Sequence, residues 1–128
     1  MRYILDTHTL LWIITEDSKL STTALKIYLD PSNVMFFSMA SVWELAIKAS
    51  LGKISLGKTL EEFIEEHVKG NDIEILDIHL PHVFRIEQLP FHHRDPFDRL
   101  IIAQVIEDNL LLVGNDTIFD LYNVKRIW

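Results

Sequence analysis

Short apolar runs without polar alternation recur along the chain, and segments with helix signals separate them. Such runs are typical of strands that are buried on both faces of a sheet. Two charged residues, Glu74 and Asp77, interrupt the third run and leave its register less defined. The pattern predicts strands over residues 3–5, 34–38, 73–78, 110–113 and 124–128.

The segments between these runs carry the start and stop signals of helices. The clearest signal is Asp95, a good N-cap, followed by Pro96 at the first helical position. Gly52 suits the position just past a helix end, and Thr59 with Glu62 has the spacing of a capping box. The signals predict helices over residues 10–14, 21–29, 41–51, 59–69, 81–89, 95–108 and 117–122.

The alternation of strands and helices favours an α/β fold with a parallel sheet and helices on both faces. We find no internal repeat, low-complexity tract or linker, so residues 1–128 are expected to form one domain. No apolar run approaches the roughly 18–20 residues that a membrane span requires, and no signal peptide is evident. We therefore expect no membrane association and a cytoplasmic location, which the absence of cysteine fits.

The net charge of −7 argues against broad electrostatic capture of nucleic acid. It does not exclude a nucleic-acid substrate if the acidic residues cluster around a metal ion and basic residues line the rim. The acidic surface also suits a basic protein partner.

Three acidic residues fall where the predicted fold brings the chain to one edge of the sheet. Asp6 follows the first strand and Asp116 follows the fourth. Parallel strands end at the same edge, which is where α/β proteins bind ligands. Asp98 lies in the first turn of helix 95–108, where the helix dipole and free N–H groups favour a carboxylate. We expect these three side chains to be neighbours.

A fourth acid, Glu44, projects from a helix that is otherwise mostly apolar. On a helical wheel of residues 41–51, Glu44 shares a narrow polar strip with Ser41 and Lys48. The rest of the circumference is apolar: Val42, Trp43, Leu45, Ala46, Ile47, Ala49 and Leu51. Because such a helix is expected to be mostly buried, the carboxylate requires a partner.

Each of these acids also has a local explanation. Three acidic residues stand at positions that cap helices: Asp6, Asp95 and Asp98. Asp116 is common in turns, and Glu44 with Lys48 has the i, i+4 spacing of a surface ion pair. These explanations leave open why the four acids at the edge should gather there.

Four carboxylates close together repel one another and raise each other's pKa values. A hard divalent cation bound through oxygen, Mg²⁺ or Mn²⁺, would relieve this repulsion. Such an ion lowers the pKa of a bound water and polarises a phosphodiester. The cluster therefore predicts metal-dependent hydrolysis of a phosphate bond.

Four motifs follow one another nearly from end to end of the chain: Leu5-Asp6-Thr7-His8, Ser41-Val42-Trp43-Glu44-Leu45-Ala46-Ile47-Lys48, Asp95-Pro96-Phe97-Asp98-Arg99 with Ala103-Gln104, and Asn115-Asp116 with Phe119. Together they resemble the PIN domain, and in particular the VapC-type toxins of type II toxin–antitoxin systems. The resemblance implies a central five-stranded parallel sheet, an Mg²⁺- or Mn²⁺-dependent endoribonuclease and usually a homodimer. It also implies a cognate VapB-type antitoxin that covers the acidic groove.

Matched one by one, the residues that the resemblance makes metal-binding and catalytic are Asp6, Glu44, Asp98 and Asp116. The residues that it places beside these ligands, in a supporting role, are Thr7, Asp95 and Asn115. Family members often carry a hydroxyl residue at the position of Gly114. A supporting hydrogen bond is therefore either missing here or supplied by Asn115 or Thr117.

The remaining charged and aromatic residues permit two interpretations each. Four basic residues could contact RNA phosphates, or could be solvated charges: Lys48, Lys53, Arg94 and Arg99. The pair His92-His93 lacks a third ligand at metal-binding spacing, so we expect it in a loop that touches substrate or nothing. The three tryptophans are expected in the core rather than as base-stacking platforms: Trp12, Trp43 and Trp128.

Two other α/β enzyme classes fit less well. A haloacid-dehalogenase-like phosphatase requires an aspartate two residues after its nucleophile, where this chain has His8. A phosphoacceptor receiver domain requires paired acids after the first strand, where Asp6 stands alone. The alternative that stays open is a catalytically silent PIN-like module that binds RNA or protein. The favoured hypothesis is an endoribonuclease acting on single-stranded or loop RNA.

Overall fold

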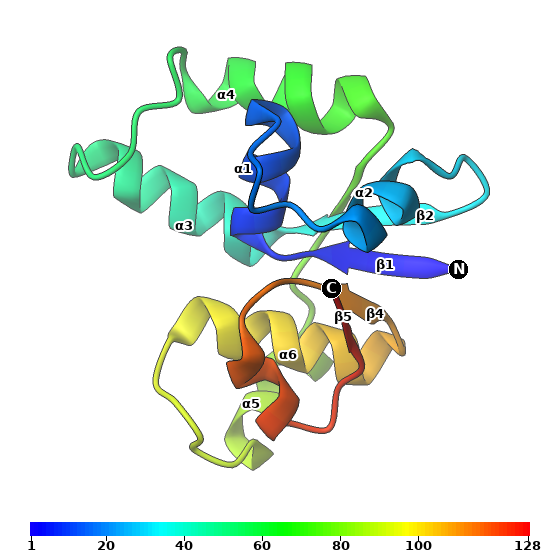
Figure 1. The fold of residues 1–128 in the computed structure, drawn as a ribbon. Helices are drawn as coiled ribbons and strands as arrows, with labels where there is room; N and C mark the ends of the chain where they lie inside the picture. Colours follow the sequence, from blue (N-terminus) through cyan, green and yellow to red (C-terminus); the bar gives the residue numbers. More distant parts are fainter.

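Five parallel strands form one sheet in the order β3-β2-β1-β4-β5, so the first strand lies at the centre (Figure 1). The computed structural model describes residues 1–128. The strands are β1 (Arg2–Leu5), β2 (Val34–Ser38), β3 (Glu74–Leu76), β4 (Leu111–Val113) and β5 (Arg126–Ile127). The predicted fold class is confirmed. β3 and β5 are shorter than predicted because each lies at a sheet edge and pairs with one neighbour only.

The connections carry six α-helices and three helical segments of other types. The α-helices are α1 (Thr7–Thr15), α2 (Thr22–Leu29), α3 (Met39–Ser50), α4 (Leu60–Phe63), α5 (Leu80–Gln88) and α6 (Pro96–Asp108). The other segments are the π-helical η1 (Ile64–Val68) and the 3₁₀ turns η2 (Lys69–Asn71) and η3 (Thr117–Leu121). No helix has the length and apolar character that crossing a lipid bilayer demands.

Local capping explains where several helices begin. Three predicted N-caps accept a hydrogen bond from an amide of the first helical turn: Ser21, Thr59 and Asp95. α3 begins at Met39 rather than at Ser41, because Ser38 at the end of β2 caps it through the amide of Ala40 (2.9 Å). The helix therefore starts directly at the strand end, without an intervening loop.

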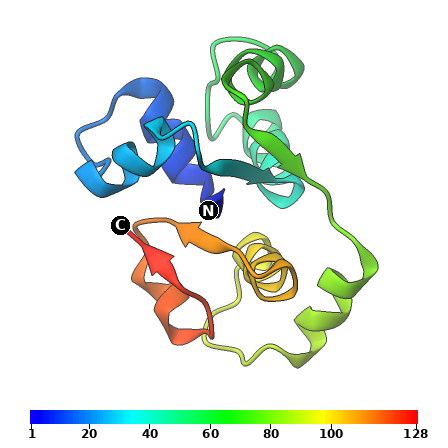
Figure 2. The ribbon, with the colours of Figure 1, turned by 90° about the vertical axis from the view of Figure 1, so that its right-hand side faces the viewer.

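Two hydrophobic cores cover the two faces of the sheet, since successive strand residues point to opposite faces. Ile4 and Leu112 pack with Ile101 of α6 on one face. Leu5 and Val113 pack on the other face with residues of α1, α2, α3 and α4. Figure 2 shows α5 and α6 on one side of the sheet and α1 and α2 on the other.

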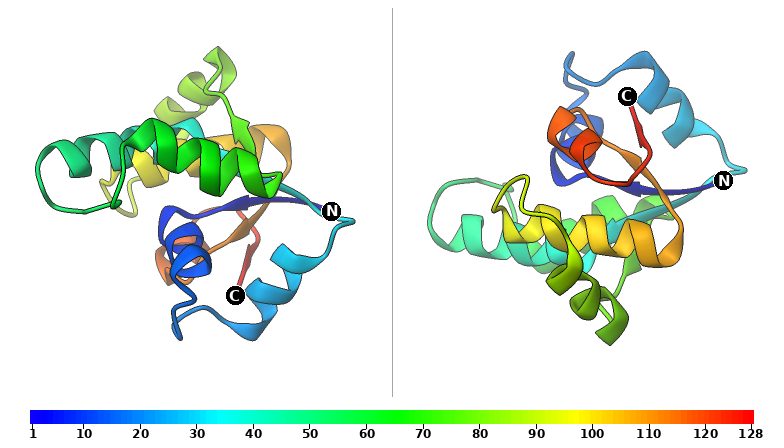
Figure 3. Two further views of the ribbon diagram at one scale, coloured as in Figure 1. Left: turned by 90° about the horizontal axis from the view of Figure 1, so that it is seen from above. Right: turned by 90° about the horizontal axis from the view of Figure 1, so that it is seen from below.

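The carboxyl ends of the three central strands meet at one edge of the sheet. α1 follows β1 and α3 follows β2, while α6 leads back into β4 and so begins near the same edge. Figure 3 shows α3 and α6 side by side. Gln104 of α6 is fully buried; it accepts from Ser38 Oγ (2.5 Å) and donates to the carbonyl oxygens of Leu76 (3.2 Å) and Asp77 (3.3 Å). α6 is thereby tied to the ends of β2 and β3.

Candidate functional site

Asp6 is a buried carboxylate at the end of the central strand. Its side chain is 6% exposed, and its backbone N–H donates to the carbonyl oxygen of Val113 in β4 (2.9 Å). Although Asp6 stands at the N-cap position of α1, no side-chain hydrogen bond caps the helix. Burial, and after it the negative charges of Glu44, Asp116 and Asp95, raise the pKa of Asp6 to about 7. These three acids therefore lie close enough to Asp6 for their charges to affect its pKa.

Gly114 allows the end of β4 to approach Asp6 closely. A Cβ atom at position 114 would lie 3.1 Å from the Cβ of Asp6, which is tighter than ordinary contact. The two residues expected to replace a hydroxyl at this position, Asn115 and Thr117, are both exposed. They line an open cleft beside Asp6 and Asp116.

Glu44 lies on the buried side of α3, where two other side chains hold its carboxylate. It is 6% exposed, and Thr7 Oγ1 donates to its Oε1 (2.9 Å). Thr7 also shares a hydrogen bond with the hydroxyl of Ser41 (2.8 Å). Lys48 Nζ donates to Glu44 Oε2 (2.6 Å), and this bond raises the pKa of Lys48. The ion pair with i, i+4 spacing is therefore present, but around a buried carboxylate rather than on the surface.

The orientation of α3 corrects two predictions. The helix turns its polar residues Ser41 and Glu44 inward, because Thr7 provides them with hydrogen-bond partners. Part of the apolar face is exposed instead, at spacings of four residues: Met39, Trp43, Ile47 and Leu51. Trp43 is 51% exposed and packs edge-on against Phe97 with ring centroids 5.1 Å apart, so it is not a core residue.

The other two tryptophans are half-buried and pack against each other. Trp12 of α1 meets Trp128 in an edge-to-face contact, with ring centroids 5.7 Å apart. Trp128 packs at the border of the core formed with α1 and α2. Trp12 also lines the cleft beside Asp6.

Asp98 lies in the first turn of α6, held there by the cap at Asp95. Asp95 Oδ1 accepts from the amides of Phe97 (2.9 Å) and Asp98 (3.0 Å), so its predicted capping role is confirmed. Burial, and after it the charges of Asp95 and Asp6, raise the pKa of Asp98 to about 7. The charge of Asp6 thus contributes to the raised pKa of Asp98, although the two residues come from distant parts of the sequence.

Asp116 is exposed and caps the short turn η3. Its Oδ1 accepts from the amide of Ile118 (3.0 Å), as a turn residue would. Asp116 also lines, with Asp6 and His8, the open cleft of about 390 Å³. The two acids that follow β1 and β4 therefore face the same space, as the sequence predicts.

The chemistry of the donors fits a hard divalent cation. Carboxylate oxygens are the ligands that Mg²⁺ and Mn²⁺ prefer, and a bound cation would stabilise the charged forms of Asp6 and Asp98, which burial disfavours. No three histidine or acidic side chains are grouped closely enough to hold one ion together. Coordination of one ion by three of the acids therefore requires side-chain rotations.

The basic residues differ in their access to an RNA phosphate. Arg94 and Lys53 are exposed, and Lys48 is half-buried against Glu44. Arg99 is only 4% exposed, so the expectation that it contacts RNA is corrected. Its guanidinium donates to the carbonyl oxygens of Pro90 (2.8 Å) and Leu89 (3.3 Å), which hold it inside the protein.

The expectation that His93 touches substrate or nothing is corrected, because its side chain contacts the predicted metal ligand Asp98. Its Nε2 lies 3.2 Å from Asp98 Oδ2, and its Nδ1 lies 2.7 Å from the hydroxyl of Tyr122. Tyr122 is 29 residues away along the chain, so no local spacing indicates the contact. Only the folded arrangement of η3 beside the start of α6 brings them together.

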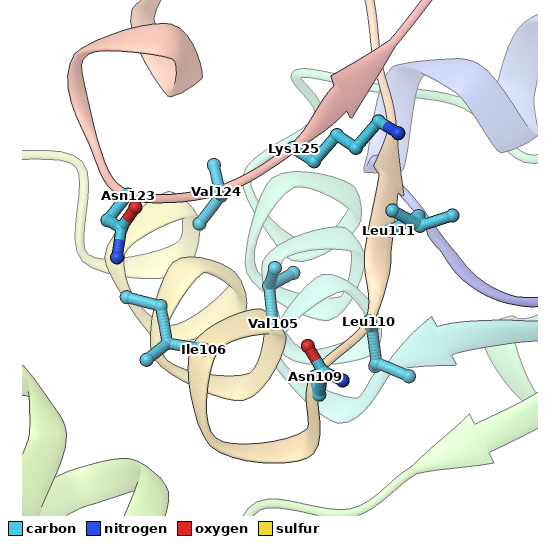
Figure 4. Close-up of a pocket in the computed structure, with 8 residues that line it drawn as sticks. All are labelled: Val105, Ile106, Asn109, Leu110, Leu111, Asn123, Val124 and Lys125. Atoms are coloured by element: carbon cyan, nitrogen blue, oxygen red, sulfur yellow. The ribbon is translucent and has the colours of Figure 1, made fainter.

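A larger cavity lies at the opposite edge of the sheet. It has a volume of about 570 Å³ and lies between α6, the start of β4 and the segment before β5 (Figure 4). Lys125 is the only charged residue in its lining. It is separate from the acidic residues, which gather at the carboxyl ends of the strands.

Comparison with known proteins agrees with this arrangement. The family profile described as PIN domain matches residues 3–125. No curated protein gives a match. Three similar solved structures are chains of VapBC2 from Rickettsia felis, bound to a DNA fragment from its promoter, of VapBC-1 from nontypeable Haemophilus influenzae, and of DNA-bound VapBC from Salmonella typhimurium.

The likeness to these structures extends over the whole chain, at low sequence identity. The Rickettsia felis chain has a TM-score of 0.74 and 19% identity, and the match covers 99% of this chain and 98% of that one. The Haemophilus influenzae chain has a TM-score of 0.70 and 16% identity, covering 99% and 97%. The Salmonella typhimurium chain has a TM-score of 0.68 and 21% identity, covering 99% and 97%. These structures share the fold, and the family profile spans nearly every residue: the chain belongs to the PIN domain family.

Proposed function

We propose that the protein is a metal-dependent endoribonuclease of the VapC toxin type, which uses Mg²⁺ or Mn²⁺ and is inhibited by a cognate VapB-type antitoxin. The observation that carries this proposal is that acids from three different elements lie at one sheet edge. Asp6 and Asp116 line the same cleft, and Asp6 lies close enough to Asp98 for its charge to contribute to the raised pKa of Asp98. Carboxylates gathered in this way are typical of divalent-cation sites.

Four acids would hold the metal: Asp6, Glu44 and Asp98 directly, and Asp116 directly or through water. When bound, the ion would polarise the phosphodiester and lower the pKa of a water ligand. Thr7 orients Glu44 through its hydroxyl, and the Asp95 cap fixes the start of the helix that carries Asp98. No side chain of the site is placed to act as a nucleophile.

Two cations at the rim would attract the RNA backbone. Arg94 is exposed next to Asp95, and Lys48 would become available once a metal displaces it from Glu44. Because the protein has a net charge of −7, these residues and the metal must offset the repulsion of phosphates. The substrate is single-stranded or loop RNA, in which the bases are accessible.

Two protein partners complete the proposal. The structural neighbours are chains of VapBC, which supports a VapB-type antitoxin whose basic segment covers the acidic cleft. A second copy of the chain would cover the exposed apolar stripe of α3, formed by Met39, Trp43, Ile47 and Leu51.

One observation favours a second candidate, a catalytically silent module that binds RNA or protein. Lys48 already neutralises Glu44, and no three acids are grouped around one point. In such a module, the acids would be structural charges held by caps and an ion pair. The two candidates differ in whether the protein binds a divalent cation and cleaves RNA.

Cation binding can be measured by Mn²⁺ titration calorimetry at neutral pH and low salt. We expect saturable binding to the wild-type protein and at least about tenfold weaker binding to Asp98→Asn, since a ligand is lost. Asp72→Asn is the matched control, because Asp72 is an exposed acid before β3. Equal heats for all three proteins would contradict a carboxylate site.

RNA cleavage gives the direct test of activity. Asp6→Asn should abolish cleavage of single-stranded RNA in Mn²⁺, because the substitution removes a metal ligand. The wild-type protein with EDTA is the reference for loss of metal. RNA cleavage by Asp6→Asn would contradict the nuclease proposal. A wild-type protein that binds RNA without cleaving it would favour the silent module.

The stability of the metal-free protein should fall as the pH rises. Asp6 and Asp98 have pKa values of about 7 in the folded protein against an ordinary value of 3.8, so between these values the folded state holds protons that the unfolded chain has released. The stability present below the ordinary pKa is thus lost as the pH rises through about 7. Melting temperatures should decline from about pH 5 to about pH 8, less steeply in Asp6→Asn, and Mn²⁺ should restore stability at the upper end. A parallel decline in both proteins would contradict the raised pKa of Asp6.

The self-association surface can be tested by light scattering on size-exclusion chromatography. Leu51→Glu places a charge in the apolar stripe of α3 and should convert a dimer to a monomer. Leu29→Glu is the matched control, since Leu29 is 65% exposed on α2 and Leu51 is 62% exposed. A wild-type protein that elutes as a monomer at all concentrations would rule out the homodimer.

A further inference from the structure

The hydroxyl of Tyr122 lies at the centre of a buried hydrogen-bonded chain beneath the start of α6. Tyr122 is 5% exposed. Its oxygen lies 3.2 Å from Arg99 Nη1, 3.3 Å from the backbone nitrogen of His93 and 2.7 Å from His93 Nδ1. The imidazole continues the chain to Asp98, whose Oδ2 lies 3.2 Å from His93 Nε2.

The direction of every hydrogen bond in this chain follows from which groups can only donate. A guanidinium and a backbone N–H have no acceptor capacity, so Arg99 and the His93 amide both donate to the tyrosine oxygen. A phenol oxygen has two lone pairs, and these two donors occupy both. The O–H of Tyr122 must therefore donate, and the short contact to His93 Nδ1 is the bond that it makes.

It follows that His93 carries its proton on Nε2. Nδ1 accepts from Tyr122, so the neutral imidazole has its N–H on the opposite side of the ring, facing Asp98 Oδ2. A doubly protonated ring would direct a third donor at the tyrosine oxygen, which has no lone pair left for it. The hydrogen-bonded chain thus selects one tautomer and one donor direction toward Asp98.

Arg99 is fixed too firmly to donate elsewhere. Its guanidinium also donates hydrogen bonds to the carbonyl oxygens of Leu89 and Pro90. The guanidinium carbon Cζ lies 4.2 Å from the ring centroid of Phe91. These contacts bind the segment before α6 to the helix itself. The buried arginine therefore serves as the fixed end from which the orientation of Tyr122 and His93 follows.

The geometry points to His93 as a positioning residue for Asp98. The hydrogen bonds from Arg99 through Tyr122 hold His93 in its Nε2–H tautomer, which donates to Asp98 Oδ2 and leaves Oδ1 for a divalent cation. This inference rests on the proposed function, because the cation is part of that proposal. Hydrogen bonds from an outer group to a ligating carboxylate typically change metal affinity by about 10–100-fold. A purely structural role of His93, packing its loop against η3, would leave that affinity unchanged.

The tautomer can be read without any activity, from long-range ¹H–¹⁵N spectra of the metal-free protein at a pH above the ordinary histidine pKa of about 6.5. We expect protonated Nε2 and bare Nδ1 in His93, whereas Tyr122→Phe should allow the Nδ1–H form. His92 is the internal reference, because it is exposed and contacts Tyr122 only through its ring edge. A wild-type His93 with its proton on Nδ1, or on both nitrogens, would overturn the inference.

The effect on Asp98 can be read from Mn²⁺ affinity. His93→Leu should weaken binding about 10–100-fold, and His93→Gln should recover most of the loss, since its amide can donate to Asp98. His92→Leu is the matched control and should leave the affinity unchanged. Equal affinity in His93→Leu and the wild type would overturn the positioning role. Should His93→Leu fail to fold, Tyr122→Phe takes its place, with unchanged affinity overturning the inference in the same way.

The two measurements also separate this inference from the function on which it rests. If the wild-type protein shows the Nε2–H tautomer but binds no Mn²⁺, the hydrogen-bonded chain stands, the proposed function fails, and with it the role toward a metal. If Mn²⁺ binds and the tautomer is the other one, only the inference about His93 fails.

Discussion

The candidate site depends on a carboxylate buried at the end of a strand that has neighbours on both sides. β1 is the central strand, and Asp6 directly after it is only 6% exposed. Withdrawal from water disfavours its charged form, and nearby acids add to the effect. The surrounding elements are arranged around this unfavourable charge: a glycine at the end of β4 gives it room, and α3 and α6 both begin nearby.

The other acids are held by groups that fix the positions of their carboxyl oxygens. Glu44 is bonded by a hydroxyl on one oxygen and an ammonium on the other. Asp98 is bonded by an imidazole on one oxygen, and its own amide is held by the Asp95 cap. Fixed orientation is what a coordination site needs from its ligands, since a loose carboxylate loses entropy when it binds.

Much of this arrangement could be predicted because its causes are local. Asp6 could be placed because it comes directly after a strand. Asp98 could be placed because Asp95 and Pro96 mark the start of the helix that carries it. The orientation of α3 could not be predicted, because a helical wheel shows how wide a face is and not which tertiary partner it meets; Trp43 is exposed for this reason. The burial of Arg99 and its link through Tyr122 to the site likewise depend on contacts between distant segments.

The close approach of Gly114 to Asp6 also constrains how this protein could evolve. A side chain at position 114 would need the backbone or Asp6 to give by a few tenths of an ångström, and Asp6 directly follows the central strand. A substitution of Gly114 would therefore act on a buried acid of the site. The effect of a side chain at position 114 depends on how far Asp6 can shift, so substitutions at the two positions are expected to be non-additive.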